Sequence, residues 1–222
     1  MQKRKIIIGD YDTAAHGWTL TRWKLSAAVQ KTRYVDKPSG DGAWDLSTAL
    51  TDGVPKYNDR ELTATLECSE NSRLEREAVI QHMINLLDGF RWKIRLPDDD
   101  LHYIMGRLHV AREYNDLAHA SVTMRAVCEP WKYANTETLV SLTASANIQV
   151  VPLTNKGRQV VVPTLTVTGA SASVLLEYGA SSITLSAGTY QWPSLILAPG
   201  RHELTLSGTG SVLVSYREAV LE

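Results

Sequence analysis

The chain has 222 residues, a formal net charge of -1, 44% hydrophobic residues and 21% charged residues. These values exclude wholesale disorder, and the length allows one large β domain or two ordinary ones with a substantial core. The balanced charge argues against a nucleic-acid-binding protein. Because the first apolar stretch, residues 6–8, is short and no apolar run reaches eighteen residues, we expect neither a secretion signal nor a membrane span.

The sequence of the N-terminal part predicts strands on both sides of a long polar segment. Residues 5–8 and part of 18–29 are strand candidates, joined by a turn-rich connection. Residues 61–68 alternate strictly, which is typical of a half-buried strand. Their predicted inward side chains are those of Leu62, Ala64, Leu66 and Cys68.

We use the name "arm" for residues 37–52. The arm begins with a polar loop that contains two glycines (37–42), continues with the short segment 43–47, and ends at the start of a second turn cluster (51–55). A polar excursion without secondary structure of its own is usually functional or mobile. Trp44 and Tyr57 lie next to turns, and two interpretations of them are open. In the first, they are exposed and anchor an interface with another subunit. In the second, the arm folds back and Trp44 is buried in its own subunit.

Residues 72–88 are predicted to form a helix. Asn71 or Ser72 can cap it, with Glu75 completing a capping box. Gly89 follows the last periodic residue and suits the left-handed cap conformation. The predicted apolar face consists of Leu74, Ala78, Ile80, Met83, Ile84 and Leu87.

Strands are predicted again over residues 90–96, 103–111 and 120–128. Strands on both sides of one helix predict an α+β sandwich with the helix packed on a sheet. The two cysteines, Cys68 and Cys128, each end an alternating run on its apolar face, so we interpret them as buried thiols rather than a disulfide framework.

From residue 134 the composition shifts to Ser, Thr, Val, Leu and Gly without a helical period. Short strands between regular turn signals indicate an all-β sandwich. We therefore predict a mainly β protein with two domains, residues 1–133 and 134–222. The predicted C-terminal strands are 138–142, 146–151, 160–168, 173–178, 182–185, 195–197, 201–206 and 211–217.

The sequence carries no standard catalytic or cofactor-binding motif. His102 and His109 flank a predicted strand behind Asp98–Asp100, but their spacing fits no usual set of metal ligands. A solvated hairpin tip is the preferred interpretation of the three aspartates. We expect no catalytic activity, no cofactor and no metal.

Carbohydrate binding is the alternative function, because aromatic rings on a β-sandwich can stack on sugars. Tyr190 and Trp192 are the candidate sugar-binding residues. They also lie on one face of their segment, as core residues would, and core packing is the preferred interpretation.

The arm and its surroundings resemble the N-terminal half of phage distal tail proteins. The loop Pro38-Ser39-Gly40-Asp41-Gly42, the run Trp44-Asp45-Leu46, and Tyr57, Asn58 and Arg60 downstream carry the resemblance. The family's loop often has an arginine, which this chain lacks. The likeness continues through residues 129–133, the N-x-G turn at 155–157 with Pro163, the L-x-P-G-x-H-x-L run at 197–204 and the closing S-Y-R-E at 215–218.

The resemblance implies a hexameric ring of N-terminal domains in the tail of a siphophage or prophage, with galectin-like C-terminal domains. Such a ring would join the tail tube protein to the tip or baseplate proteins, after assembly in the host cytoplasm. DNA would pass through the lumen without specific binding. The interface residues that it implies in and near the arm are Pro38, Asp41, Gly42, Trp44, Asp45, Tyr57 and Arg60.

Overall fold

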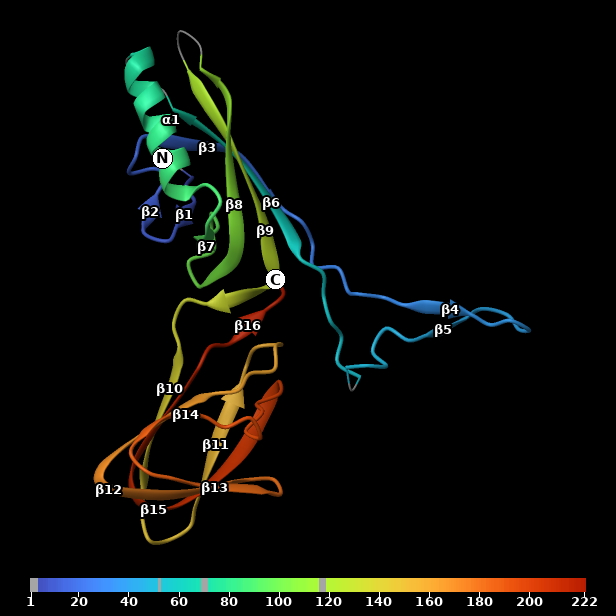
Figure 1. Ribbon diagram of the computed structural model, residues 1–222, viewed down its shortest axis with the longest axis vertical. Helices are drawn as coiled ribbons and strands as arrows, with labels where there is room; N and C mark the ends of the chain where they lie inside the picture. Colours follow the sequence, from blue (N-terminus) through green and yellow to red (C-terminus); the bar gives the residue numbers. More distant parts are fainter. Residues whose placement is uncertain (1–3, 52, 69–71, 116–118) are drawn as a thin grey trace. The chain divides into compact units, whose positions relative to one another are not determined.

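The computed structural model describes residues 4–51, 53–68, 72–115 and 119–222 (Figure 1). The chain folds as two compact units, residues 1–132 and 133–222. The sequence-based division after residue 133 lies one position away. As predicted, the protein is mainly β, with a single α-helix in the described part of the chain. That helix is too short and too polar to span a membrane.

The N-terminal unit is built on one curled sheet with the strand order β2-β1-β7-β8-β9-β6-β3. The central strand β6 runs antiparallel to both β3 and β9. Its side chains alternate as predicted, because Leu62, Ala64, Leu66 and Cys68 are all at most 1% exposed. The strands are β1 (Ile7–Ile8), β2 (Tyr11–Asp12), β3 (Trp18–Leu25), β6 (Arg60–Cys68), β7 (Arg91–Arg95), β8 (His102–Asn115) and β9 (Ala120–Ala134).

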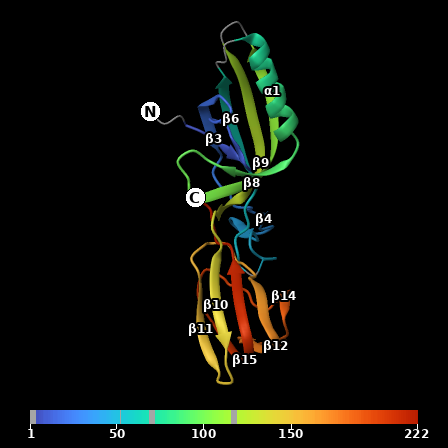
Figure 2. The same cartoon turned by 90° about the vertical axis from the view of Figure 1, so that its left-hand side faces the viewer.

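Helix α1 (Arg73–Leu87) covers one face of this sheet (Figure 2). The predicted capping box is confirmed: the Glu75 amide donates to Ser72 Oγ at 3.1 Å, and the Ser72 amide donates to the Glu75 carboxylate at 3.0 Å. The alternative cap, Asn71, lies outside the described residues. Gly89 has the left-handed conformation expected of it, with φ of 80°.

The buried stripe of α1 differs from the predicted one. Ile80, Met83 and Leu87 are fully buried as expected. Leu74 is 83% exposed and Ala78 is also exposed, so their assignment to the core was wrong. Because a helix advances about 100° per residue, both positions point away from a stripe centred on Ile80 and Met83.

Both cysteines are buried in the core of this unit, as the sequence indicates. Cys68 and Cys128 are 0% and 1% exposed, and neither is in a disulfide. Burial raises the pKa of Cys128 to about 12. Neither thiol is therefore an accessible nucleophile in the folded protein.

The C-terminal unit is a β-sandwich organised by two long strands, β12 and β15. The N-terminal half of β12 and the C-terminal half of β15 pair with β14 and β10, whereas the opposite halves pair with β13 and β11. Two four-stranded layers result, enclosing one core; Figure 2 shows β10, β15 and β12 side by side. The strands of the sandwich are β10 (Thr138–Ala144), β11 (Gln149–Asn155), β12 (Thr164–Tyr178), β13 (Ser181–Leu185), β14 (Gly188–Gln191) and β15 (Gly200–Tyr216). Strand β16 (Ala219–Val220) lies outside its layers and pairs with β9.

The sequence prediction divided these long strands. Residues 160–168 and 173–178 were predicted as separate strands, but Thr164 to Tyr178 form the single strand β12, and β15 likewise joins 201–206 to 211–217. Residues 195–197 contribute only an isolated bridge, Val161 to Leu197. Glycine and serine turn signals marked bends within strands here rather than their ends.

Gly208 makes the bend of β15 possible. Its φ is 114°, and a Cβ atom at this position would lie 2.1 Å from the carbonyl oxygen of Ser173 on β12. Only glycine both adopts this backbone conformation readily and allows such a close approach. The bend carries β15 from one layer of the sandwich to the other.

Candidate assembly interface

Between β3 and β6 the chain forms a two-stranded ribbon, which we define as residues 29–58. Strands β4 (Tyr34–Asp36) and β5 (Ala43–Asp45) pair antiparallel, with Val35 opposite Trp44. Nearer the sheet, the Lys31 amide donates to the Lys56 carbonyl at 2.8 Å. The expectation that the arm lacks secondary structure is thus corrected, because the ribbon contains its own strand pair. Figure 1 shows this ribbon extending away from the sheet.

The ribbon exposes large apolar side chains. Trp44 is 51% exposed, which excludes the interpretation that the arm folds back and buries it. A two-stranded hairpin alone is marginally stable in water, and contiguous exposed apolar side chains mark interaction sites. The exposed apolar residues of the ribbon are Val29, Tyr34, Val35, Trp44, Leu46, Leu50 and Val54.

The predicted interface residues divide into two groups. We call β4, β5 and the loop between them (residues 34–46) the tip. Five of the predicted interface residues are exposed on β5 or on this loop: Pro38, Asp41, Gly42, Trp44 and Asp45. Gly42 has φ of 74°, the conformation that closes the loop. The structure therefore brings these five residues together at one end of the ribbon.

The other two residues, Tyr57 and Arg60, lie at the base of the ribbon. Arg60 is 4% exposed, and its Nε donates to the carbonyl oxygen of Ser26 at 2.6 Å. The Tyr57 ring meets the Trp131 ring edge-on, with centroids 5.5 Å apart. In this chain both side chains hold the ribbon to the sheet.

The carboxylate of Asp45 is fixed at the tip. Its Oδ1 accepts a hydrogen bond from the Ser47 amide at 2.9 Å, and the Ser47 hydroxyl accepts one from the Arg33 amide at 2.8 Å. Hydrogen bonds from Ser47 hold the pKa of Asp45 below its ordinary value. The tip accordingly presents a negative charge at neutral pH on the face of the ribbon that Asp45 shares with Tyr34.

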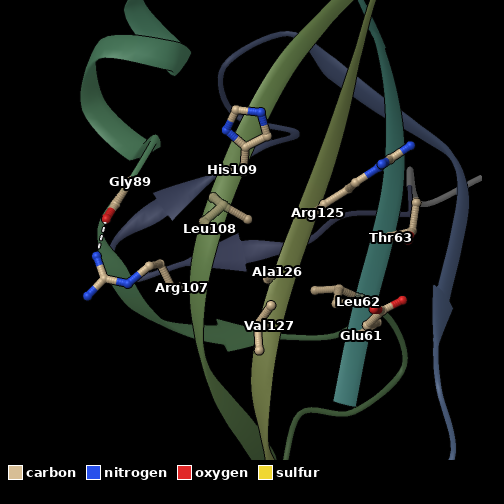
Figure 3. Close-up of a pocket in the computed structure, with 10 residues that line it drawn as sticks. All are labelled: Glu61, Leu62, Thr63, Gly89, Arg107, Leu108, His109, Arg125, Ala126 and Val127. Atoms are coloured by element: carbon tan, nitrogen blue, oxygen red, sulfur yellow. Dashed lines mark hydrogen bonds between the residues drawn. The ribbon is translucent and has the colours of Figure 1, made fainter. Parts of the chain in front are cut away.

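A second feature, which the sequence reasoning missed, is a pocket of about 550 Å³ on the sheet face opposite α1. Figure 3 shows that it spans β6, β9 and β8. We call it the outer pocket. Its polar side chains occupy outward strand positions between the buried Leu62, Leu108 and Ala126. The alternation along the strands therefore predicts an outward polar face, but not the pocket on it. Its lining residues are Glu61, Leu62, Thr63, Gly89, Arg107, Leu108, His109, Arg125, Ala126 and Val127.

The outer pocket combines positive charge with apolar surface. Arg107 donates to the Gly89 carbonyl, and the His109 ring lies 2.8 Å from the Asp88 carboxylate. The Arg125 guanidinium forms no hydrogen bond or ion pair with any described residue. Val127, two residues after Arg125 on β9, is 59% exposed.

The candidate sugar-binding residues are integrated in the C-terminal core. Trp192 is 6% exposed, and Tyr190 packs against the same core with its ring over Gly188. The ring face that a sugar would need is therefore covered at Trp192. The Tyr178 hydroxyl, another aromatic polar group of this unit, contacts His202 at 2.8 Å.

The three aspartates at 98–100 do not assemble a metal site. Among the described residues no cluster of three or more His, Cys, Asp or Glu side chains is placed to hold a metal ion. Asp99 instead contacts His102 Nδ1 at 3.0 Å and Lys132 Nζ at 3.2 Å. Partial burial raises the pKa of Asp99, but the hydrogen bonds and charges of these two partners outweigh it and lower the pKa.

No protein-family model matches the sequence, and the comparison with curated proteins finds no match. Among solved structures, the SPP1 Dit (gp 19.1) protein aligns over 97% of this chain and 99% of its own, with a TM-score of 0.69 and 14% identity. The chain has the fold of Dit. That protein is described as a hub of the adsorption apparatus in phages infecting Gram-positive bacteria. At this identity the likeness establishes the fold, and function has to be argued from the site.

A chain of the phage P2 baseplate, in its activated conformation with Ca, is a more distant structural neighbour. It aligns over 97% of this chain and 98% of its own, with 8% identity and a TM-score of 0.48. The Dit likeness spans both compact units, which means that the combination of an N-terminal sheet with a β-sandwich is itself shared.

Proposed function

We propose that this protein is a structural virion protein that forms the ring-shaped hub at the distal end of a phage or prophage tail. The ring joins the tail tube protein to the tip or baseplate proteins. The observation that carries the proposal is the ribbon, whose apolar tip is exposed in a chain with the fold of the SPP1 Dit hub protein.

A partner is needed to stabilise the ribbon. Exposed Trp44 and Tyr34 are the aromatic side chains that anchor protein interfaces. In a ring of copies each ribbon would contact the neighbouring N-terminal unit, a head-to-tail arrangement that closes only at the correct rotation. We propose six copies. The protein has no enzymatic role in this assembly, and DNA passes through its lumen without specific binding.

The proposal places the protein in the virion tail after assembly in the host cytoplasm. The C-terminal sandwich, for which we propose a galectin-like topology, would project from the ring. The covered indole of Trp192 gives no support to the alternative function, a carbohydrate-binding module.

The solution mass tests the proposal. We expect light scattering coupled to size exclusion to give a species near six times the chain mass of 24.6 kDa, appearing as a ring in negative stain. Deletion of residues 39–48 removes β5 and most of the loop before it and should yield a folded monomer. A ring that survives the deletion would contradict the role of the ribbon, and a monomer at every concentration, with or without tail proteins, would contradict the hub function.

A further inference from the structure

We propose that the outer pocket is the receptor for the ribbon tip of the next copy of this chain. The proposal rests on the ring proposed above and names the contact that closes it. The pocket and the tip are separate surfaces on one unit, and each has the chemical features that the other requires.

The outer pocket requires a partner that is both acidic and apolar. Its one carboxylate, Glu61, is outnumbered by Arg107 and Arg125, and the Arg125 guanidinium is without a partner among the described residues. The strand register adds Lys24 beside Thr63 on the same face. The exposed Val127 in the lining makes the site unlike a simple phosphate-binding surface, which would offer donors throughout.

The tip has the complementary composition. It holds three aspartates against one lysine, a net charge of -2. Tyr34, which is 62% exposed, lies opposite Asp45 in the strand register, and the lowered pKa of Asp45 keeps that carboxylate ionised. An aromatic ring such as that of Tyr34 can stack on an arginine while the carboxylate on the same face accepts its hydrogen bonds. A pocket of about 550 Å³ lies in the range that accommodates such a group of side chains.

The tip of one copy is directed away from its own pocket. The ribbon returns to the sheet next to Glu61 in the pocket wall, because the Ser26 amide donates to the Glu61 carbonyl at 2.9 Å. At a rise of about 3.3 Å per extended residue the outgoing segment, residues 26–38, spans at most roughly 40 Å, and Figure 1 shows the ribbon leading away from the sheet. A contact between two different surfaces of identical chains is heterologous, which is the type that builds rings.

Two variants of the full chain test the contact. Arg125→Glu alters the pocket and Asp45→Arg alters the tip; both side chains are exposed, so the folds should persist by circular dichroism and melting. We expect each variant to weaken self-association by at least about 30-fold, as loss of one partner of an interfacial charge pair does. Arg22→Glu, on the same sheet face but outside the pocket lining, is the matched control and should assemble normally.

Mixing the two variants gives the decisive result. The Arg125→Glu copy keeps a normal tip and the Asp45→Arg copy keeps a normal pocket, so this contact should form with its native charges. The other contact in the mixture pairs the two reversed charges, which also attract, so mixing should restore association that neither variant shows alone.

Three outcomes separate the explanations. If the wild type forms rings and Arg125→Glu leaves them unchanged, the pocket proposal is overturned while the hub function stands. If the wild type never self-associates, even with tail proteins present, both fail. If Arg125→Glu abolishes only retention of nucleic acid, the pocket is a polyanion site and the proposal is wrong.

Discussion

The Tyr57 ring meets the Trp131 ring edge-on at the base of the ribbon, with centroids 5.5 Å apart and planes inclined at 77°. This contact joins a residue 13 positions after Trp44 in the ribbon to strand β9. It explains why a ribbon without a covering layer leaves the sheet in a defined direction. We expect a coupling free energy of about 0.5–1.5 kcal/mol in a double-mutant cycle of Tyr57→Ala and Trp131→Ala.

Hydrogen exchange would measure the consequence for the ribbon. In Trp131→Ala the amides of Lys31 and Asn58, which donate to the carbonyls of Lys56 and Val29 across the ribbon base, should exchange faster, while those of β6 should not change. Equal exchange in the wild type and the variant would show that the aromatic contact does not order the base.

Two tryptophans provide an internal comparison of core and surface. Trp192 is 6% exposed and Trp44 is 51% exposed. We expect Trp192→Ala to destabilise the protein by about 3–5 kcal/mol, because it leaves a cavity, and Trp44→Ala to change the melting temperature little. A Trp192→Ala variant that keeps its melting temperature but loses glycan binding would reinstate the carbohydrate module.

Comparing Gly208 with Gly179 distinguishes the cost of a steric clash with an added Cβ atom from the cost of a positive φ alone. Both have positive φ, but a Cβ at Gly208 would collide with the Ser173 carbonyl whereas nothing lies near one at Gly179. Gly208→Ala should therefore cost at least about 2 kcal/mol in urea unfolding, and Gly179→Ala about 1 kcal/mol. Equal losses for the two variants would mean that the β12 backbone moves away without cost.

The contacts of Asp99 predict a pH dependence of stability. Its folded-state pKa lies below the ordinary value of 3.8, so the unfolded chain binds the proton more tightly. The contribution is complete above that value and is lost as the pH falls through the lower folded pKa. Urea unfolding between pH 6 and pH 3 should show a smaller loss in Asp99→Asn than in the wild type. Asp98→Asn, at a position without a comparable contact among the described residues, should behave as the wild type does.

Local patterns in the sequence determined much of this protein. The alternation over 61–68, the capping box at Ser72 and Glu75, and the buried cysteines all follow from interactions between near neighbours or from a period of two. The polar loop with its glycines likewise predicted an exposed tip. Each of these signals lies within a few residues of the structure that it specifies.

Only the tertiary structure decided the rest, because those features depend on strand register and on distant neighbours. The bend at Gly208 brings its backbone against Ser173 on another strand. The turn signals alone predicted that one strand ends there and another begins. The outer pocket arises where register aligns Thr63 with Arg125, two residues far apart in sequence. Burial of Trp192 depends on closing two layers over it, since a period of two describes a buried face and an exposed one equally well.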